Sequence, residues 1–202
     1  GRRGGLRGGG EGGGGGEDVR EGGRSRWGTL ERALDLRVED ARSRGFADGS
    51  CDAVACVSVI EHVAGDGDAR AMQEMWRVLR PGGVLHLTTN VSARPGEVRT
   101  RRPVYDTGDA QPHGEGAFFE RRYSAQTLAS RLLALGWREE AREYVRERLP
   151  VHRRFFAARP LSFLVGGLLP LACVRNFASI AGPEALAPGE HGGGYLRLRR
   201  PE

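Results

Sequence analysis

The run Cys51–Ile60 (CDAVACVSVI) most constrains what this chain can fold into, because it is almost continuously apolar and rich in valine. A run of this length without polar alternation is typical of a strand buried on both faces, as in a parallel sheet. The next segment, Asp68–Leu79, is predicted to form a helix, because its apolar residues recur three and four positions apart and share one face. Pro81-Gly82-Gly83 predicts a turn, and Val84–Thr89 predicts the next strand. This order of strand, helix and strand predicts an α/β sheet.

The flanking segments extend this α/β pattern. Leu34–Val38 alternates apolar and polar residues, which predicts a half-exposed strand upstream. A long polar connection runs from Asn90 to Glu120. Ser124 is a helix-capping residue, and the helix that it begins is expected to run to Leu135 and to stop at Gly136. Two late strands are expected, over Arg142–Leu149 and Tyr195–Arg199.

Between the late strands lies an apolar insertion, residues 150–192, whose apolar part is Phe155–Ala181. Its densest stretch contains Pro170 and is too short and interrupted to span a bilayer. So much apolar surface must cover something, and three occupants stay open: the domain itself, a substrate pocket, or a membrane surface. We favour a lid over an apolar or lipid-like molecule, with peripheral membrane contact through residues 155–181 as the alternative.

The beginning of the chain has a different composition. Fourteen of the 32 glycines fall within residues 1–28, and residues 1–26 contain almost no sizeable apolar side chain. Such a segment cannot bury enough surface to fold, so we expect disorder over 1–26 and one domain over 27–202. Its Gly/Arg repeats are similar to RGG-type RNA-binding arms. However, the first 26 residues contain no aromatic side chain for base stacking, so no nucleic-acid partner is expected.

The amino-acid composition argues against several other classes of protein. All 31 basic residues are arginine, which suggests GC-rich codon usage and weakens the net charge of +5 as a sign of nucleic-acid binding. The three cysteines are odd in number and form no CxxC pair, so neither a disulfide framework nor a metal site is expected. Without a signal peptide pattern at its start, the chain is expected to be cytoplasmic.

Two segments resemble a known family. The segments ADGSCDAVACVSVIEHV (47–63) and MWRVLRPGGVLHLT (75–88) closely resemble the central half of class I S-adenosylmethionine-dependent methyltransferases of type 11. The pieces occur in the family's order and at ordinary spacing. The resemblance implies a Rossmann-like doubly wound sheet, S-adenosylmethionine as cofactor, and methyl transfer to a small or lipid-like acceptor.

The resemblance also implies site residues. Asp40 and Ala41 would flank the adenine ring, and a carboxylate can accept a hydrogen bond from its amino group. Val57 and Ser58, at the carboxyl end of a strand, would line the cofactor channel, with Glu61 beside them. His62 is the candidate catalytic base, because its ordinary pKa suits proton transfer near neutrality; a purely structural role is the other interpretation.

One family motif is missing from this sequence. No apolar strand precedes any of the glycine-rich stretches, so the family's glycine loop after its first strand is absent. This predicts an incomplete sheet in which the strand Cys51–Ile60 is left as an open apolar edge. It also predicts weak cofactor binding, so a catalytically dead methyltransferase-like scaffold stands beside the active enzyme as an alternative.

Overall fold

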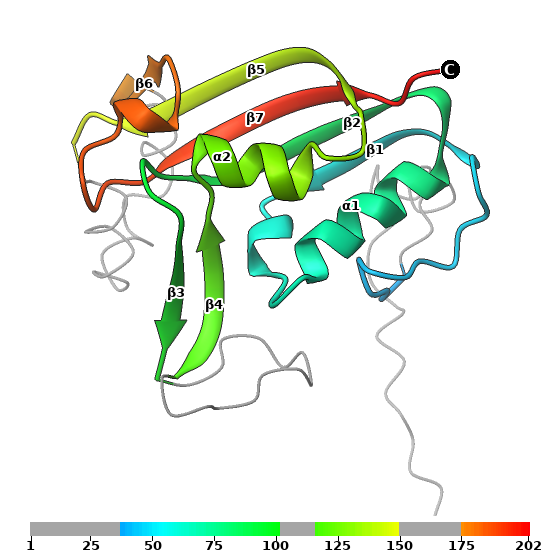
Figure 1. The fold of residues 1–202 in the computed structure, drawn as a ribbon, viewed down its shortest axis with the longest axis horizontal. Helices are drawn as coiled ribbons and strands as arrows, with labels where there is room; N and C mark the ends of the chain where they lie inside the picture. The colour runs from blue at the N-terminus through cyan, green and yellow to red at the C-terminus, as the bar shows by residue number, and fades with distance from the viewer. Residues whose placement is uncertain (1–36, 102–115, 150–174) are drawn as a thin grey trace, which may run out of the picture. The chain divides into compact units, whose positions relative to one another are not determined.

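The computed structural model describes residues 37–101, 116–149 and 175–202. The predicted disorder of 1–26 and most of the insertion 150–192 lie outside these residues. Residues 39–202 group into one compact unit, and the description below concerns that unit. Figure 1 shows its helices and strands.

A five-stranded sheet organises the unit, in the order β1-β2-β7-β5-β6. The strands are β1 (Cys51–Val57), β2 (Leu79–Val91), β7 (Gly192–Arg199), β5 (Arg138–Glu147) and β6 (Phe177–Ile180). β1 and β2 are parallel, and every other pair of neighbours is antiparallel. The structure thus confirms the predicted α/β sheet and the parallel pair, and the two expected late strands are present as β5 and β7.

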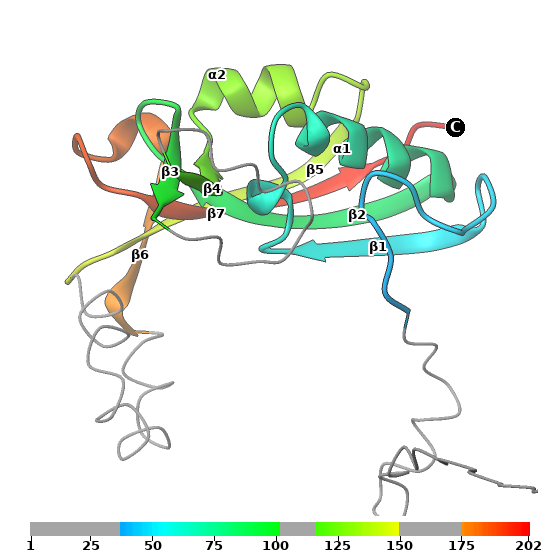
Figure 2. The same cartoon turned by 90° about the horizontal axis from the view of Figure 1, so that it is seen from below.

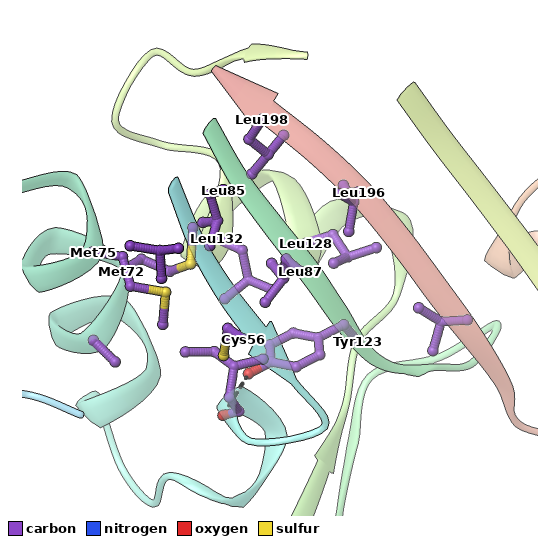
Figure 3. Packing of buried hydrophobic residues seen from close by; sticks show 14 of the residues in the cluster. Cys56, Met72, Met75, Leu85, Leu87, Tyr123, Leu128, Leu132, Leu196 and Leu198 are labelled. Carbon is purple, nitrogen blue, oxygen red and sulfur yellow. Dashed lines mark hydrogen bonds between the residues drawn. The ribbon is translucent and has the colours of Figure 1, made fainter. Parts of the chain in front are cut away.

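Helix α1 (Gly67–Val78) makes the crossover between the parallel strands. It lies within one residue of the predicted helix at each end, because its apolar stripe faces the sheet. Figure 2 shows α1 and α2 on the same face of the sheet. Between the helices and the sheet lies the core, which gathers side chains from α1, from the helical turn 128–132 that follows α2, and from strands β1, β2, β5 and β7. Figure 3 shows part of this core, including Met72, Met75, Leu85, Leu87, Leu128, Leu132, Leu196 and Leu198.

The second helix begins where the sequence predicts. Ser124 accepts a hydrogen bond from the Thr127 backbone amide, and the Thr127 hydroxyl accepts one from the Ser124 amide. This reciprocal cap starts α2 (Ala125–Thr127), which continues as one π-helical turn, η2 (Leu128–Leu132). The regular helix is therefore shorter than the predicted run to Leu135. Gly136, with φ of 79°, follows it at the expected stop.

Strand β1 differs from its prediction in one respect. Its pairing is parallel as expected, but only Val54 and Cys56 are buried, and alternate residues are exposed. Among the described residues β1 pairs with β2 alone, so it is an edge strand. The predicted turn Pro81-Gly82-Gly83 is instead an irregular start of β2, where Gly82 has φ of 76° and the register to β1 shifts.

The other corrections concern segments between the predicted elements. The connection 90–120 is not without structure, because β3 (Gly96–Thr100) and β4 (Ala117–Arg122) form an antiparallel hairpin. Residues 177–180 of the predicted lid form the edge strand β6, since they pair with β5. Residues 37 and 38 of the predicted first strand lie in no strand. Among the described helices, none has the length and apolar character needed to cross a membrane.

Candidate active site

The candidate site lies at the carboxyl ends of β1 and β2, where α/β sheets place their ligands. Ser58 directly follows β1 and has a positive φ of 50°, a conformation that non-glycine residues seldom adopt. Its backbone amide points to Thr88 at the end of β2, 3.0 Å from the hydroxyl oxygen and 3.3 Å from the carbonyl oxygen. These hydrogen bonds hold Ser58 in a strained turn, which is typical of functional sites.

Glu61 is a buried carboxylate beside this turn. It lies in the short 3-10 helix η1 (Ile60–His62) and is 1% exposed. The Thr89 hydroxyl donates to its Oε2 over a long 3.4 Å. Burial raises the pKa of Glu61 above its ordinary value, and the negative charge of Glu120 adds to this effect. Glu61 is therefore a carboxyl group that the fold makes harder to ionise.

His62 is held in one tautomer by its contact with the hairpin. Its Nδ1 lies 2.7 Å from the backbone oxygen of Phe119 in β4. A carbonyl oxygen can only accept, so Nδ1 carries a proton. The imidazole also packs on the Phe119 ring, with centroids 5.1 Å apart. An imidazole oriented in this way can accept a proton at Nε2.

Glu120 brings a second carboxylate to this end of the sheet. The Asn90 side-chain amide at the end of β2 donates to its Oε2 over 3.0 Å, and Arg122 donates to its Oε1 over 3.2 Å. Glu120 itself is 9% exposed. The hairpin β3–β4 thereby contributes one wall of the candidate site.

Asp40 is in a different setting from the other predicted residues. Its carboxylate accepts hydrogen bonds from the Arg42 backbone and guanidinium, at 2.7 to 3.0 Å, and these bonds lower its pKa to about 2. Ala41 packs against the core. Among the described residues, no hydrogen bond joins Asp40 to the group around Glu61. The adenine-binding role of Asp40 and Ala41 stays a prediction.

The structure therefore brings four of the predicted residues together, namely Val57, Ser58, Glu61 and His62. Sequence reasoning missed Thr88, Thr89 and Asn90, although three polar residues at the end of a predicted strand are a signal for such a site. Phe119 could be expected from the sequence only as one of several aromatic residues that either line a pocket or pack in the core, and Glu120 gave no signal. Within the described ranges, no group of histidine, cysteine, aspartate and glutamate residues could hold a metal ion.

One protein family has a sequence model that matches part of this chain. Residues 18–87 match the sequence model of the family described as "Methyltransferase domain". The matched segment ends inside β2 and includes β1, η1 and α1. The search of curated proteins gave no match.

Several solved structures are similar to the chain. The cyclase SpnF is 24% identical and has a TM-score of 0.48, over 86% of this chain and 59% of that one. A methyltransferase from Methanosarcina mazei is 15% identical (TM-score 0.49; 82% and 66% covered), and one from Thermotoga maritima is 16% identical (TM-score 0.39; 85% and 66% covered). The chain thus spans roughly three fifths to two thirds of the length of these proteins. Residues 18–87 are therefore similar to a methyltransferase domain, and the described part of the chain has a mixed α/β sheet.

Proposed function

We propose that the carboxyl ends of β1 and β2 form a methyl-transfer site, which binds S-adenosylmethionine and a small or lipid-like methyl acceptor. The observation that supports this proposal most directly is the gathering of Ser58, Glu61 and His62 at the ends of two adjacent parallel strands. Ligands of open α/β sheets bind at this position. The whole protein's activity and its acceptor are part of the proposal.

The exposed surface at the end of β1 fits one side of such a cofactor. Val57 and Val59 are 64% and 43% exposed, so they offer apolar surface on which an adenine ring or a ribose can pack. The Ser58 hydroxyl lies between them in sequence and can hydrogen-bond a polar edge. Val57 and Ser58 would thus hold the cofactor.

Little covalent chemistry is then left to the protein. S-adenosylmethionine, when bound, supplies a methyl group that is already activated by its positive sulfur. The protein's residues orient the acceptor and remove its proton. His62 accepts that proton at Nε2, while its Nδ1–H stays on the Phe119 carbonyl. Glu120 makes the surroundings of the reacting atom more favourable to positive charge.

The proposal predicts weak but site-specific cofactor binding. We expect millimolar S-adenosylmethionine to shift the NMR signals of Val57, Ser58, Glu61 and His62. Calorimetry should give an affinity weaker than micromolar, because micromolar binding needs about 8 kcal/mol and the sequence predicts no glycine loop. Val57→Glu should abolish the shifts, whereas Leu149→Glu, at an equally exposed residue, should leave them unchanged.

Two outcomes would contradict this assignment. NMR shifts confined to other parts of the sheet would show that the cofactor binds elsewhere. An absence of any shift at saturating cofactor would favour a methyltransferase-like scaffold without a donor site. Micromolar affinity by calorimetry would overturn the expectation of weak binding, while the NMR shifts would still decide the location.

A further inference from the structure

We propose that Asp68, Arg121 and Arg131 are positioning residues, which hold the η1 turn against β4 and so fix the tautomer and orientation of His62. The inference rests on the proposed function where it treats His62 as the proton acceptor. Its physical content, a fixed imidazole, can be tested without any cofactor.

Asp68 is the centre of this cluster. It lies in the first turn of α1, and its side chain is completely buried. Its Oδ2 accepts hydrogen bonds from Arg121 Nη1 at 2.5 Å, from Tyr123 Oη at 2.8 Å and from Arg131 Nε at 2.8 Å. Arg131 Nη2 adds a bond to Oδ1 at 2.6 Å. One carboxylate therefore joins α1, β4 and η2.

Both arginines also bind the loop that follows η1. Arg121 Nη2 and Arg131 Nη2 donate to the backbone oxygen of Gly65, at 2.8 and 2.6 Å. Gly65 has φ of 65°, so this bend favours glycine. Arg121 Nη2 also donates to Glu97 Oε1 of β3 at 3.0 Å. The two arginines of the cluster are therefore matched by two carboxylates, those of Asp68 and Glu97.

Strand β4 and the segment around η1 are also in contact at His62. Gly65 follows His62 by three residues in the loop, and Phe119 precedes Arg121 by two residues in β4. Strand β4 therefore contacts the loop twice, once through Arg121 and once through the Phe119 carbonyl that binds His62. If the first contact is lost, β4 and the loop can shift relative to each other, and the hydrogen bond of His62 lengthens.

The groups around Asp68 favour its ionised form. Burial opposes its ionisation, but the hydrogen bonds from Arg131, Tyr123 and Arg121 outweigh burial and hold the pKa of Asp68 below its usual range. Asp68 is therefore ionised at neutral pH, and its hydrogen bonds to the two arginines carry charge. Charge-assisted hydrogen bonds of this kind are short and directional, which suits a positioning role.

The test compares the imidazole of His62 in matched variants by heteronuclear NMR, with His62→Gln used to identify its signals. Asp68→Asn removes the charge at the centre of the cluster. Arg121→Lys keeps a positive charge but cannot bind Asp68 and the Gly65 oxygen together. Glu140→Gln is the control, since Glu140 also accepts from two arginines, Arg197 and Arg199, but lies in β5.

We expect wild type and Glu140→Gln to show a predominant Nδ1–H tautomer. In Asp68→Asn and Arg121→Lys, the Nδ1–H tautomer of His62 should no longer predominate. Its tautomer populations should approach those of a solvent-exposed histidine. A folded Arg121→Lys or Asp68→Asn variant that keeps the wild-type tautomer would overturn the proposal. Should Asp68→Asn fail to fold, Arg121→Lys alone decides. Because no cofactor is added, a failure here is distinct from a failure to bind S-adenosylmethionine.

Discussion

At the scale of single residues, two buried carboxyl groups experience opposite environments. Asp68 is surrounded by two guanidinium groups and a phenol, which lower its pKa. Glu61 has only a long hydrogen bond from a threonine hydroxyl, and burial raises its pKa. Folding therefore favours the charged form of Asp68 and the neutral form of Glu61. A buried group whose ionisation is unfavourable for stability is a candidate for function.

Glu61→Gln should stabilise the protein in a pH-dependent way. The folded-state pKa of Glu61 is raised, so its contribution to stability is fully present below its unfolded value of 4.5 and is lost as the pH rises through the folded value. Glutamine cannot ionise, and the variant should therefore unfold at higher denaturant than wild type at about pH 7 but not at about pH 4. Glu143→Gln, at an exposed position, is the control. Equal midpoints for Glu61→Gln and wild type at both pH values would show that Glu61 is not strained by its burial.

At the scale of elements, strand β7 depends on a run of glycines. Gly192–Gly194 pair with both β2 and β5 at the central position of the sheet. A Cβ on Gly192 would collide with the backbone oxygen of Val145, and one on Gly194 would lie 3.2 Å from the Tyr144 ring. Gly193 is less crowded, since its nearest neighbour would be the Val145 side chain at 3.4 Å. Glycine is thus required here for close packing.

Gly192→Ala should therefore destabilise the sheet much more than Gly193→Ala. Overpacking against a backbone group costs about 1–3 kcal/mol, whereas the Gly193 neighbour is a side chain that can move. Denaturant unfolding of both variants measures the difference. Equal losses of stability would indicate that β7 can shift to admit a side chain at Gly192.

The elements also show where sequence reasoning works and where it fails. Periodicity located α1 within one residue, because its apolar stripe is set locally by Met72 and Met75. The apolar run of β1 is also a local pattern, and its carboxyl end at Val57 predicted the position of the candidate site. The hairpin β3–β4 was not predicted, because its pairing joins segments on either side of a long polar stretch, and Glu120 was missed with it. Strand β6 exists only through its pairing with β5, which no local pattern reveals.

At the scale of the whole unit, the helices cover one face of the sheet (Figure 2). On the opposite face, Thr88 lies beside Tyr195 and His86 beside Arg197, and His86 Nδ1 is 2.9 Å from the Tyr195 hydroxyl. Near the centre of the sheet, this face therefore carries polar side chains. The apolar segment 155–181 lies almost wholly outside the described residues, so its role as lid or membrane contact stays a prediction.

A vesicle experiment separates these two roles. If residues 155–181 form a lid, the chain should not sediment with vesicles, whether they contain phosphatidylserine or phosphatidylcholine alone. Arginines flank the segment, so membrane docking would instead give salt-sensitive binding to the anionic vesicles. The double variant Phe163→Asp, Leu168→Asp would then abolish binding, whereas Leu149→Asp would not. That result would overturn the lid.

Hydrogen exchange should be uneven along β1. A strand directs its successive backbone amides alternately to its two sides. Those that point to β2 are hydrogen-bonded in the sheet, while the intervening ones point to an edge that no described strand occupies. In deuterated water, neighbouring amides of Cys51–Val57 should therefore exchange at rates that alternate between slow and fast, and the central strand β7 should be slow throughout.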